Sequence, residues 1–223
     1  MSSKLQKFFA KVDRCASCRA AKNPLRHVFG GGKAQTPKYF FLFINPTHKN
    51  ISTQPTYAGR RRYPFMGVRH FYRELSQAGF VDAKIIADIY KRGWQLEDEN
   101  RIERNLHKEG VYITNFVKCA RPDPSNPSLS SMRAHLPLLA QELEIVQPKF
   151  IVTFGLLPLS ALAGTSFRMR DFLAAARNKT YAPVPSLALN KISYKILPCF
   201  YPLGHGNPPK AQEILAYIKK HFA

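Results

Sequence analysis

Residues 39–45, YFFLFIN, form an uninterrupted apolar run that ends in Asn45 and is followed by Pro46. An apolar run of this length without polar alternation is typical of a strand that is covered on both faces, as in a parallel sheet. Three further runs have the same character: 111–119 (VYITNFVKC), 150–154 (FIVTF) and 193–199 (SYKILPC). We predict that these four segments are the strands of the fold.

Helical patterns separate these predicted strands. Helical spacing or composition marks five segments: 68–75, 96–107, 132–146, 156–163 and 208–222. The short apolar run 84–90 is a candidate for an additional strand. Strands that alternate with helices indicate a three-layer α/β/α fold with a four-stranded parallel sheet, which we expect to be one domain over residues 1–223.

The charge of the chain indicates a polyanionic partner. Lys and Arg number 34 against 14 Asp and Glu, which gives a formal net charge of +20 at pH 7. A field of this sign attracts nucleic acid most commonly, although a general gain in solubility is the alternative. No stretch is apolar for long enough to span a bilayer, and the first residues lack the apolar run of a signal peptide. We therefore expect an intracellular monomer that is neither secreted nor membrane-bound.

Four cysteines are present, at positions 15, 18, 119 and 199. Intracellular thiols are usually reduced, so metal binding is favoured over disulfide bonds. Residues 1–37 are basic, rich in small residues and show little apolar periodicity. We expect a metal site, rather than a hydrophobic core, to order this segment.

Unusual residues follow three of the predicted strands. Asn45 and Pro46 follow the first, residues 115–119 end the second, and residues 201–207 follow the fourth. Right-handed crossovers place the carboxyl ends of parallel strands along one edge of the sheet, where ligand sites form. The sequence therefore predicts a functional site at this edge.

Several strings in this chain together resemble one known family. They are ITNFVKCARP (113–122), LPLLAQELEIVQPKFIVTFG (136–155), RRYPFMG (61–67), FINPT (43–47) and PCFYPLGHGNPP (198–209). Their order and spacing are similar to those of the uracil-DNA glycosylase superfamily, most of all its thermophilic-type iron–sulfur branch. The match covers nearly the whole chain, except that segment 81–111 exceeds its counterpart in that branch and has no assigned role.

The resemblance implies that Asn45 is catalytic and that Ile44 and Pro46 flank it in the substrate pocket. The iron–sulfur branch usually has Gly-Glu-Ala-Pro-Gly here, whereas Ile-Asn-Pro is similar to mismatch-specific branches in which the Asn acts on water. A neutral amide holds a water against the sugar but takes its proton poorly, so such a site depends on stabilising the leaving base. The alternative is that Asn45 only caps a turn before Pro46.

Two further residues are candidates for binding the flipped base. The resemblance assigns Phe65 as its stacking platform and Asn115 as the reader of its edge, because an amide matches the O4 and N3–H of uracil. The alternatives are a core phenylalanine and a strand-end asparagine that bonds to its own backbone.

The second catalytic motif departs from the family pattern. Where the family has His-Pro-Ser, with the His stabilising the departing base, this chain has Tyr201, Pro202 and Leu203. Either the phenol of Tyr201 or the imidazole of His205 could take over that role. Leu203 is a candidate wedge for the gap that the flipped base leaves, or a loop residue folded into the core.

Basic residues around these motifs are candidate phosphate contacts. They are Arg60, Arg61, Arg62, Lys118 and Arg121. Backbone contacts of this kind carry no sequence information and make the affinity for DNA fall steeply with salt. A merely solvated basic face is the alternative for each of them.

The resemblance also implies a metal site. Cys15, Cys18 and Cys119 match three cluster-binding cysteines of the iron–sulfur branch, and His135 stands where the fourth is expected. Three Cys and one His could bind a [4Fe–4S] cluster, which the resemblance favours, or zinc. Cys199 is a rival fourth ligand, although we interpret it as a small buried residue on the fourth strand.

Together these features predict a monofunctional DNA glycosylase that excises uracil from DNA by hydrolysing the N-glycosidic bond after base flipping. Three alternatives stay open. They are a glycosylase for another altered base such as hypoxanthine or mismatched thymine, a non-catalytic nucleic-acid-binding protein on the same fold, and a zinc module that binds RNA.

Overall fold

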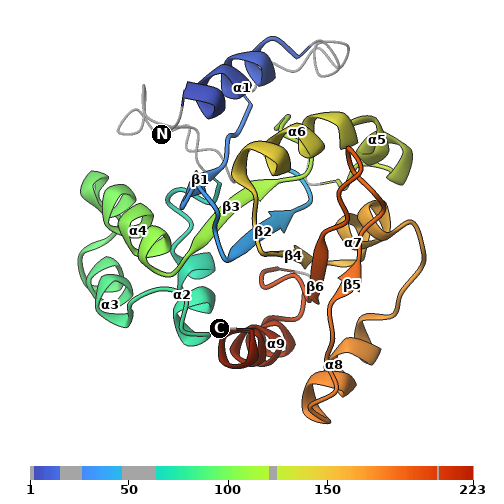
Figure 1. The fold of residues 1–223 in the computed structure, drawn as a ribbon. Helices are drawn as coiled ribbons and strands as arrows, with labels where there is room; N and C mark the ends of the chain where they lie inside the picture. The colour runs from blue at the N-terminus through green and yellow to red at the C-terminus, as the bar shows by residue number, and fades with distance from the viewer. Residues whose placement is uncertain (1–2, 16–26, 47–63, 121–124, 205, 223) are drawn as a thin grey trace.

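A computed structural model of the chain describes residues 3–15, 27–46, 64–120, 125–204 and 206–222 (Figure 1). The strands in these ranges are β1 Gly31–Gly32, β2 Tyr39–Phe43, β3 Val111–Asn115, β4 Phe150–Phe154, β5 Val184–Pro185 and β6 Lys195–Cys199. The helices are α1 Ser3–Asp13, α2 Arg69–Gln77, α3 Ala83–Arg92, α4 Leu96–Lys108, α5 Leu129–Ala134, α6 Leu136–Val146, α7 Leu156–Ala163, α8 Met169–Arg177 and α9 Pro208–His221.

All six strands belong to one sheet in the order β1-β3-β2-β4-β6-β5. The four central strands β3, β2, β4 and β6 are parallel, as predicted, while the two-residue strands β1 and β5 pair antiparallel at the edges. The edge strands were missed because neither is an apolar run. At Gly32 the close approach of β1 requires glycine, because a Cβ there would overlap the carbonyl oxygen of Val111.

Helices cover both faces of the sheet, which confirms the three-layer α/β/α architecture (Figure 1). Tyr39, Phe41 and Phe43 of β2 pack against α2, α3, α4, α8 and α9, on what we name the α9 face. Phe40 and Leu42 point the other way and pack with α1, α5, α6 and α7, on the α6 face. Every residue of β2 is buried, as expected for a central strand between two helical layers.

The N-terminal segment contains a packed helix that the sequence interpretation overlooked. In α1 the buried side chains are Leu5, Phe8, Phe9 and Val12, which recur at helical spacing, and the ring of Phe9 stacks on Phe29 with 4.5 Å between centroids. The prediction that this segment has no core of its own was therefore wrong for residues 3–13.

The candidate strand at residues 84–90 was also wrong, because these residues lie in α3. The side chain of Asp82 caps this helix by accepting a hydrogen bond of 2.8 Å from the backbone N–H of Lys84. Ile86 and Ile89 lie three residues apart and bury one face. A short apolar run fits a strand and a buried helix equally, and here the cap decides between them.

The long helix predicted over residues 132–146 is divided in two at His135. This residue ends α5, with its N–H bonded to the carbonyl oxygen of Met132 at 2.9 Å, and it also begins α6. The break lies on the α6 face of the sheet and turns the imidazole toward Cys119. Helix α9 begins as expected, since Asn207 accepts a hydrogen bond of 3.2 Å from the N–H of Lys210.

Candidate functional site

The carboxyl ends of β2 and β3 are joined beyond the strands themselves. Phe43 is the register partner of Asn115, and two further hydrogen bonds extend the pairing, from the N–H of Phe116 to the oxygen of Phe43 (2.8 Å) and from Val117 to Ile44 (3.0 Å). These bonds fix the segments that carry Asn45 and Asn115 side by side. The predicted edge of the sheet therefore brings the first motif and the base-reading candidate together.

The ring of Phe43 is the centre of an aromatic cluster at this edge. Its centroid lies 4.2 Å from that of Phe154, 4.7 Å from that of Phe65 and 6.1 Å from that of Tyr201. Asn115 projects to the same α9 face, because it follows the buried Val111 and Ile113 at the two-residue period of a strand. Phe65, Asn115 and Tyr201 thus converge on one place, although they come from distant parts of the sequence.

Asn115 has an unsatisfied acceptor in this apolar setting. The residue is 2% exposed, and its Oδ1 atom is buried without a hydrogen-bond partner among the residues that the structure describes. A buried acceptor without a partner costs about 1–3 kcal/mol of stability, so proteins rarely keep one without a use for it. The alternative in which this oxygen bonds to its own backbone is wrong, and the atom is free to accept a donor from a ligand.

Phe65 is buried and strained in the described structure. Its ring stacks on Phe71 with 3.9 Å between centroids, and only 1% of the residue is exposed. Its φ of 60° lies in the left-handed region, which bulky residues rarely adopt and which costs about 1–3 kcal/mol. Such strain is concentrated at functional sites. The stacking role stays a prediction, because a base would have to reach the ring face that Phe71 leaves free.

Asn45 lies at the end of the β2 segment and is 8% exposed. An N–H of its amide donates to the carbonyl oxygen of the next residue, Pro46, at 3.1 Å, which is a local side-chain-to-backbone bond. This bond does not use the Oδ1 atom, which is the atom that would accept a hydrogen bond from a water. Pro46 is buried beside it, whereas the side chain of Ile44 packs on the α6 face, so only the Ile44 backbone borders the cluster.

The phenol of Tyr201 is held in its neutral form. Burial raises its pKa to about 12, so the O–H remains a donor at neutral pH. The loop that follows folds back on this residue, because the N–H of Asn207 donates to the carbonyl oxygen of Tyr201 at 3.0 Å. Leu203 is half-buried and packs against the core of the α9 face. His205 lies outside the described residues.

Of the five predicted phosphate contacts, the structure describes only Lys118. Arg60, Arg61, Arg62 and Arg121 lie outside the described residues, whereas Lys118 is only 1% exposed. Its ammonium donates to the carboxylate of Glu142, to the hydroxyl of Thr114 and, at 2.7 Å, to the carbonyl oxygen of Asn115. The prediction that Lys118 contacts DNA was therefore wrong, because a buried ammonium with three acceptors cannot reach a phosphate.

The Lys118 and Glu142 pair belongs to a polar network inside the α6 face. Glu142 also accepts hydrogen bonds from Tyr112 at 2.9 Å and from Thr114 at 3.1 Å. Burial pushes the pKa of Lys118 down, while the Glu142 carboxylate opposes that shift and favours the charged ammonium. The sequence signal for this network is the polar Thr114 inside the buried strand β3, directly before Asn115.

Two of the predicted metal ligands lie together, although the sulfur of Cys119 is in a disulfide bond in this structure, contrary to the expectation of a reduced thiol. The Sγ atom of Cys119 is 4.0 Å from Nε2 of His135, while Nδ1 of the same imidazole bonds to the carbonyl oxygen of Ser131 at 2.8 Å. A carbonyl oxygen only accepts, so Nδ1 carries the proton and Nε2 keeps its lone pair toward the sulfur. Metal-binding histidines are commonly oriented in this way. One tetrahedral metal would hold a sulfur and a nitrogen roughly 3.6 Å apart, so the spacing is close to that of a single metal. In a [4Fe–4S] cluster the two side chains would bind different irons and would have to lie farther apart than they do here.

The end of α1 reaches the same corner through His27, which the sequence interpretation missed. His27 forms a backbone bridge with Cys119, and its Nδ1 lies 3.4 Å from the carboxylate of Asp13. Cys15 follows two residues after Asp13, is partly exposed and is not in a disulfide. Cys18 lies outside the described residues. Within the described ranges, no three His, Cys, Asp or Glu side chains are close enough to form a metal group by themselves.

Cys199 is separate from this corner. It is buried among residues of the α9 face, whereas Cys119 belongs to the α6 face, and its thiol donates to the carbonyl oxygen of Ala211 at 3.6 Å. Burial raises the pKa of this thiol. Cys199 is therefore a small buried residue, as we interpreted it, and is not the rival fourth ligand.

Comparisons with known proteins agree with this architecture. A family model described as the uracil DNA glycosylase superfamily matches residues 29–218. A "Type-4 uracil-DNA glycosylase" of Saccharolobus solfataricus is 30% identical over 207 residues, which cover 92% of this chain and 78% of that protein. The proteins of the same name from Pyrobaculum aerophilum and Thermotoga maritima are 32% and 26% identical over 39% and 67% of this chain, and the matches span 44% and 61% of their own lengths. None of the helices that the structure describes is long and apolar enough to cross a membrane.

Proposed function

Because the chain belongs to the uracil-DNA glycosylase superfamily, we propose that it removes uracil from DNA by hydrolysing the bond between the base and the deoxyribose. The observation that carries this proposal is the unpartnered Oδ1 of Asn115 beside the aromatic cluster of Phe43, Phe65 and Tyr201. The N3–H of a uracil turned out of the helix would donate to this oxygen and satisfy it. Cytosine presents an acceptor at N3, so the same atom would reject it.

The reaction would proceed by water attack on the sugar carbon as the base departs. The Oδ1 atom of Asn45 would orient the water, while the neutral amide would contribute little as a base. Most of the rate enhancement then has to come from stabilising the negative charge on the leaving uracil. The buried phenol of Tyr201 is suited to this task, since it keeps its proton and lies in an apolar environment where a hydrogen bond to an anion is strong.

His205 is the competing donor for the leaving base. It lies four residues beyond Tyr201, between Gly204 and Gly206. Single substitutions at the two positions separate them, since only the residue that bonds the anion should lower the rate of the chemical step when changed. We favour Tyr201, because its ring already contacts the aromatic cluster.

We further propose that Cys15, Cys18, Cys119 and His135 hold a structural [4Fe–4S] cluster. The orientation of the His135 imidazole toward Cys119, and the approach of the end of α1 to Cys119 through His27, support a metal at this corner. When bound, the group would tie the N-terminal segment to the body of the fold. Zinc is the alternative, since three Cys and one His also suit it. The visible absorption of the purified protein and its iron, sulfide and zinc contents distinguish the two.

The proposed function is tested by measuring uracil release from labelled single-stranded DNA and from duplex DNA with a G·U mismatch. We expect release by the wild type and loss of release in Asn45→Ala, while the matched variant Asn178→Ala, at an exposed helix end, keeps it. Substrates with hypoxanthine or mismatched thymine belong in the same panel, because both bases also offer an N–H to Asn115. Release of one of these bases but not of uracil would replace the proposed substrate, and release of none would favour a non-catalytic DNA-binding protein.

A further inference from the structure

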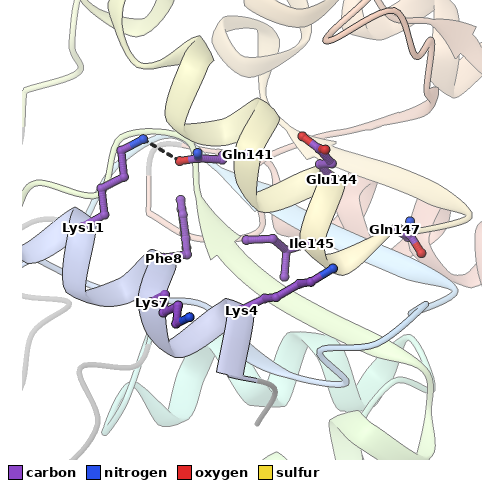
Figure 2. Close-up of a pocket in the computed structure, with 8 residues that line it drawn as sticks. All are labelled: Lys4, Lys7, Phe8, Lys11, Gln141, Glu144, Ile145 and Gln147. Atoms are coloured by element: carbon purple, nitrogen blue, oxygen red, sulfur yellow. Dashed lines mark hydrogen bonds between the residues drawn. The ribbon is translucent and has the colours of Figure 1, made fainter.

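A groove of about 600 Å³ lies between α1 and α6, on the outer side of the helical layer that covers the α6 face (Figure 2). One wall carries Lys4, Lys7 and Lys11 of α1, and the other carries Gln141, Glu144 and Gln147 at the C-terminal half and end of α6. The floor is apolar, with Phe8 and Ile145. Neither the aromatic cluster nor the proposed metal ligands line this groove.

The groove is positively charged because its lysines share one side of α1. They are spaced by three and four residues, which brings all three side chains to the same side of a helix. Lys11 donates to Oε1 of Gln141 at 2.8 Å, while Lys4 and Lys7 form no ion pair with any part of the chain that the structure describes. The carboxylate in the lining, that of Glu144, already accepts a hydrogen bond of 3.2 Å from Asn190.

The spacing of these charges suits a chain of phosphates. From Lys4 to Lys11 the helix rises about 10 Å, and a DNA strand presents one phosphate for about every 3.4 Å of its axis. The three ammonium groups are therefore spread along a length over which a strand presents about four successive phosphates, enough for each ammonium to contact one. The amides of Gln141 and Gln147 add hydrogen-bond donors along the opposite wall. Insertion of α1 into a membrane surface is not compatible with the structure, since the apolar face of the helix is buried against the fold.

The Lys11 end of the groove is connected to the carboxyl-end side of the sheet through a short series of contacts. Lys11 is two residues from Asp13, which contacts His27, and His27 pairs with Cys119 directly after the segment that carries Asn115. We propose that the groove between α1 and α6 binds the sugar-phosphate backbone of the DNA strand that flanks the base being excised. This inference rests on the proposed function for the identity of the nucleic acid, but its test does not depend on catalysis.

The test compares two triple variants of the full-length, metal-containing protein that remove equal charge. The groove variant combines Lys4→Gln, Lys7→Gln and Lys11→Gln, which removes the lysine charges of the groove. The control variant combines Lys84→Gln, Lys91→Gln and Lys108→Gln, which are exposed lysines of α3 and α4 on the other helical layer. The dissociation constant for duplex DNA without any damaged base is measured over a series of salt concentrations. Each lost phosphate contact lowers the slope of the logarithm of the dissociation constant against the logarithm of the salt concentration by about 0.9.

We expect the groove variant to lower this slope by about 2 to 3 and the control variant to leave it nearly unchanged. Lys7→Gln alone should lower it by about 1. Equal changes in the two triple variants would overturn the proposal, because the lysines would then act only through the overall charge. An unchanged slope in the groove variant would overturn it as well. Because the DNA contains no uracil, a protein that excises no base but shows the expected slopes would disprove the proposed function and leave the groove assignment intact.

Discussion

Lys118 and Glu142 form a buried ion pair that joins the turn after β3, the strand that ends in the proposed base reader Asn115, to α6, the helix that begins at the proposed metal ligand His135. Lys118 also donates to the carbonyl oxygen of Asn115, and Glu142 lies two turns beyond His135 in α6. Burying two charges costs desolvation energy that their attraction roughly offsets, so such a pair is weak evidence for stability alone. The role of the pair here is to hold the turn between Asn115 and Cys119 in place from the α6 face of the sheet.

Replacement of Glu142 by Leu should destabilise the protein by about 3–5 kcal/mol, because it leaves the Lys118 ammonium buried without a counter-charge. The double variant Lys118→Met with Glu142→Leu should recover most of this loss, since no uncompensated charge remains. Chemical denaturation of the metal-containing protein measures both effects. If the pair positions Asn115, the stable double variant should still excise uracil more slowly than the wild type. Wild-type excision in that variant would contradict a positioning role.

The unsatisfied oxygen of Asn115 predicts opposite effects on stability and activity. Asn115→Leu removes a buried acceptor that costs about 1–3 kcal/mol in the free protein, so the free energy of unfolding should stay the same or rise. Uracil excision should fall by about 100-fold or more, since the edge of the base loses its partner. Denaturant unfolding and single-turnover excision assays test the two effects together.

Asn105→Leu is the matched control for this experiment. The Asn105 side chain is satisfied, since its Nδ2 donates to the carbonyl oxygen of Phe80 at 3.0 Å and its Oδ1 accepts from the N–H of Asp82 at 3.1 Å. Its removal should lower stability without changing the excision rate. A loss of stability in Asn115→Leu similar to that in Asn105→Leu would mean that Asn115 has a structural role.

The central part of the fold was predictable because its signals are local. Four apolar runs gave the parallel strands, and the side-chain oxygen of Asn207 before Pro208 gave the start of α9. Residues 84–90 were assigned wrongly, because an apolar run of seven residues fits a strand and a helix equally and the Asp82 cap was overlooked. In α1 the four buried residues do follow helical spacing, but the many lysines among them obscured the pattern.

The candidate site was predictable by resemblance and only partly by physics. Parallel topology explains why Asn45, Asn115 and Tyr201 come to one edge, but no sequence pattern shows that a lysine in a basic protein is buried. Lys118 was a candidate DNA contact because it is a basic residue beside the motifs. Its burial could not be foreseen, because its partner Glu142 is 24 residues away on a helix whose packing depends on the whole sheet. The convergence of His27 on Cys119 is equally non-local, since it arises from a backbone bridge between distant segments.

Tyr201→Phe should lower the rate of uracil excision by about 100-fold, the usual cost of removing one donor to a developing anion. The free energy of unfolding should also depend on pH differently in the wild type and in this variant. Because the pKa of Tyr201 is about 12 in the folded protein and 10.0 ordinarily, the unfolded chain releases this proton first as the pH rises. The stabilising contribution is present below about pH 10 and is lost as the pH approaches 12. Denaturation experiments across this pH range should show that the free energy of unfolding falls less steeply with rising pH in the variant than in the wild type. An equal pH dependence in the two proteins would contradict the burial of the phenol.

Gly206→Ala should disturb the second motif while the rest of the fold remains intact. A Cβ at this position would overlap the carbonyl oxygen of Tyr201, which accepts the N–H of Asn207. The loop would have to open, so excision should fall while far-ultraviolet circular dichroism stays unchanged. Gly67→Ala provides only a partial control, because a Cβ there meets nothing within 4 Å, but its φ of 77° is left-handed whereas that of Gly206 is not. An unchanged excision rate in Gly206→Ala would contradict a role for the close approach of this loop to Tyr201.

The last prediction concerns His135, whose imidazole is held by the carbonyl oxygen of Ser131 with Nε2 toward Cys119. If this nitrogen binds a cluster, His135→Cys should retain the metal and lower its reduction potential, because replacing Cys by His raises the potential of iron–sulfur centres. His135→Ala should lose metal and destabilise the segment that contains Cys15. Iron and sulfide analysis with potentiometric titration measures the first effect, and limited proteolysis near the N-terminus measures the second. Full metal content and an unchanged potential in both variants would show that a group other than His135 completes the site, and His27, whose backbone pairs with Cys119, would be the next residue to replace.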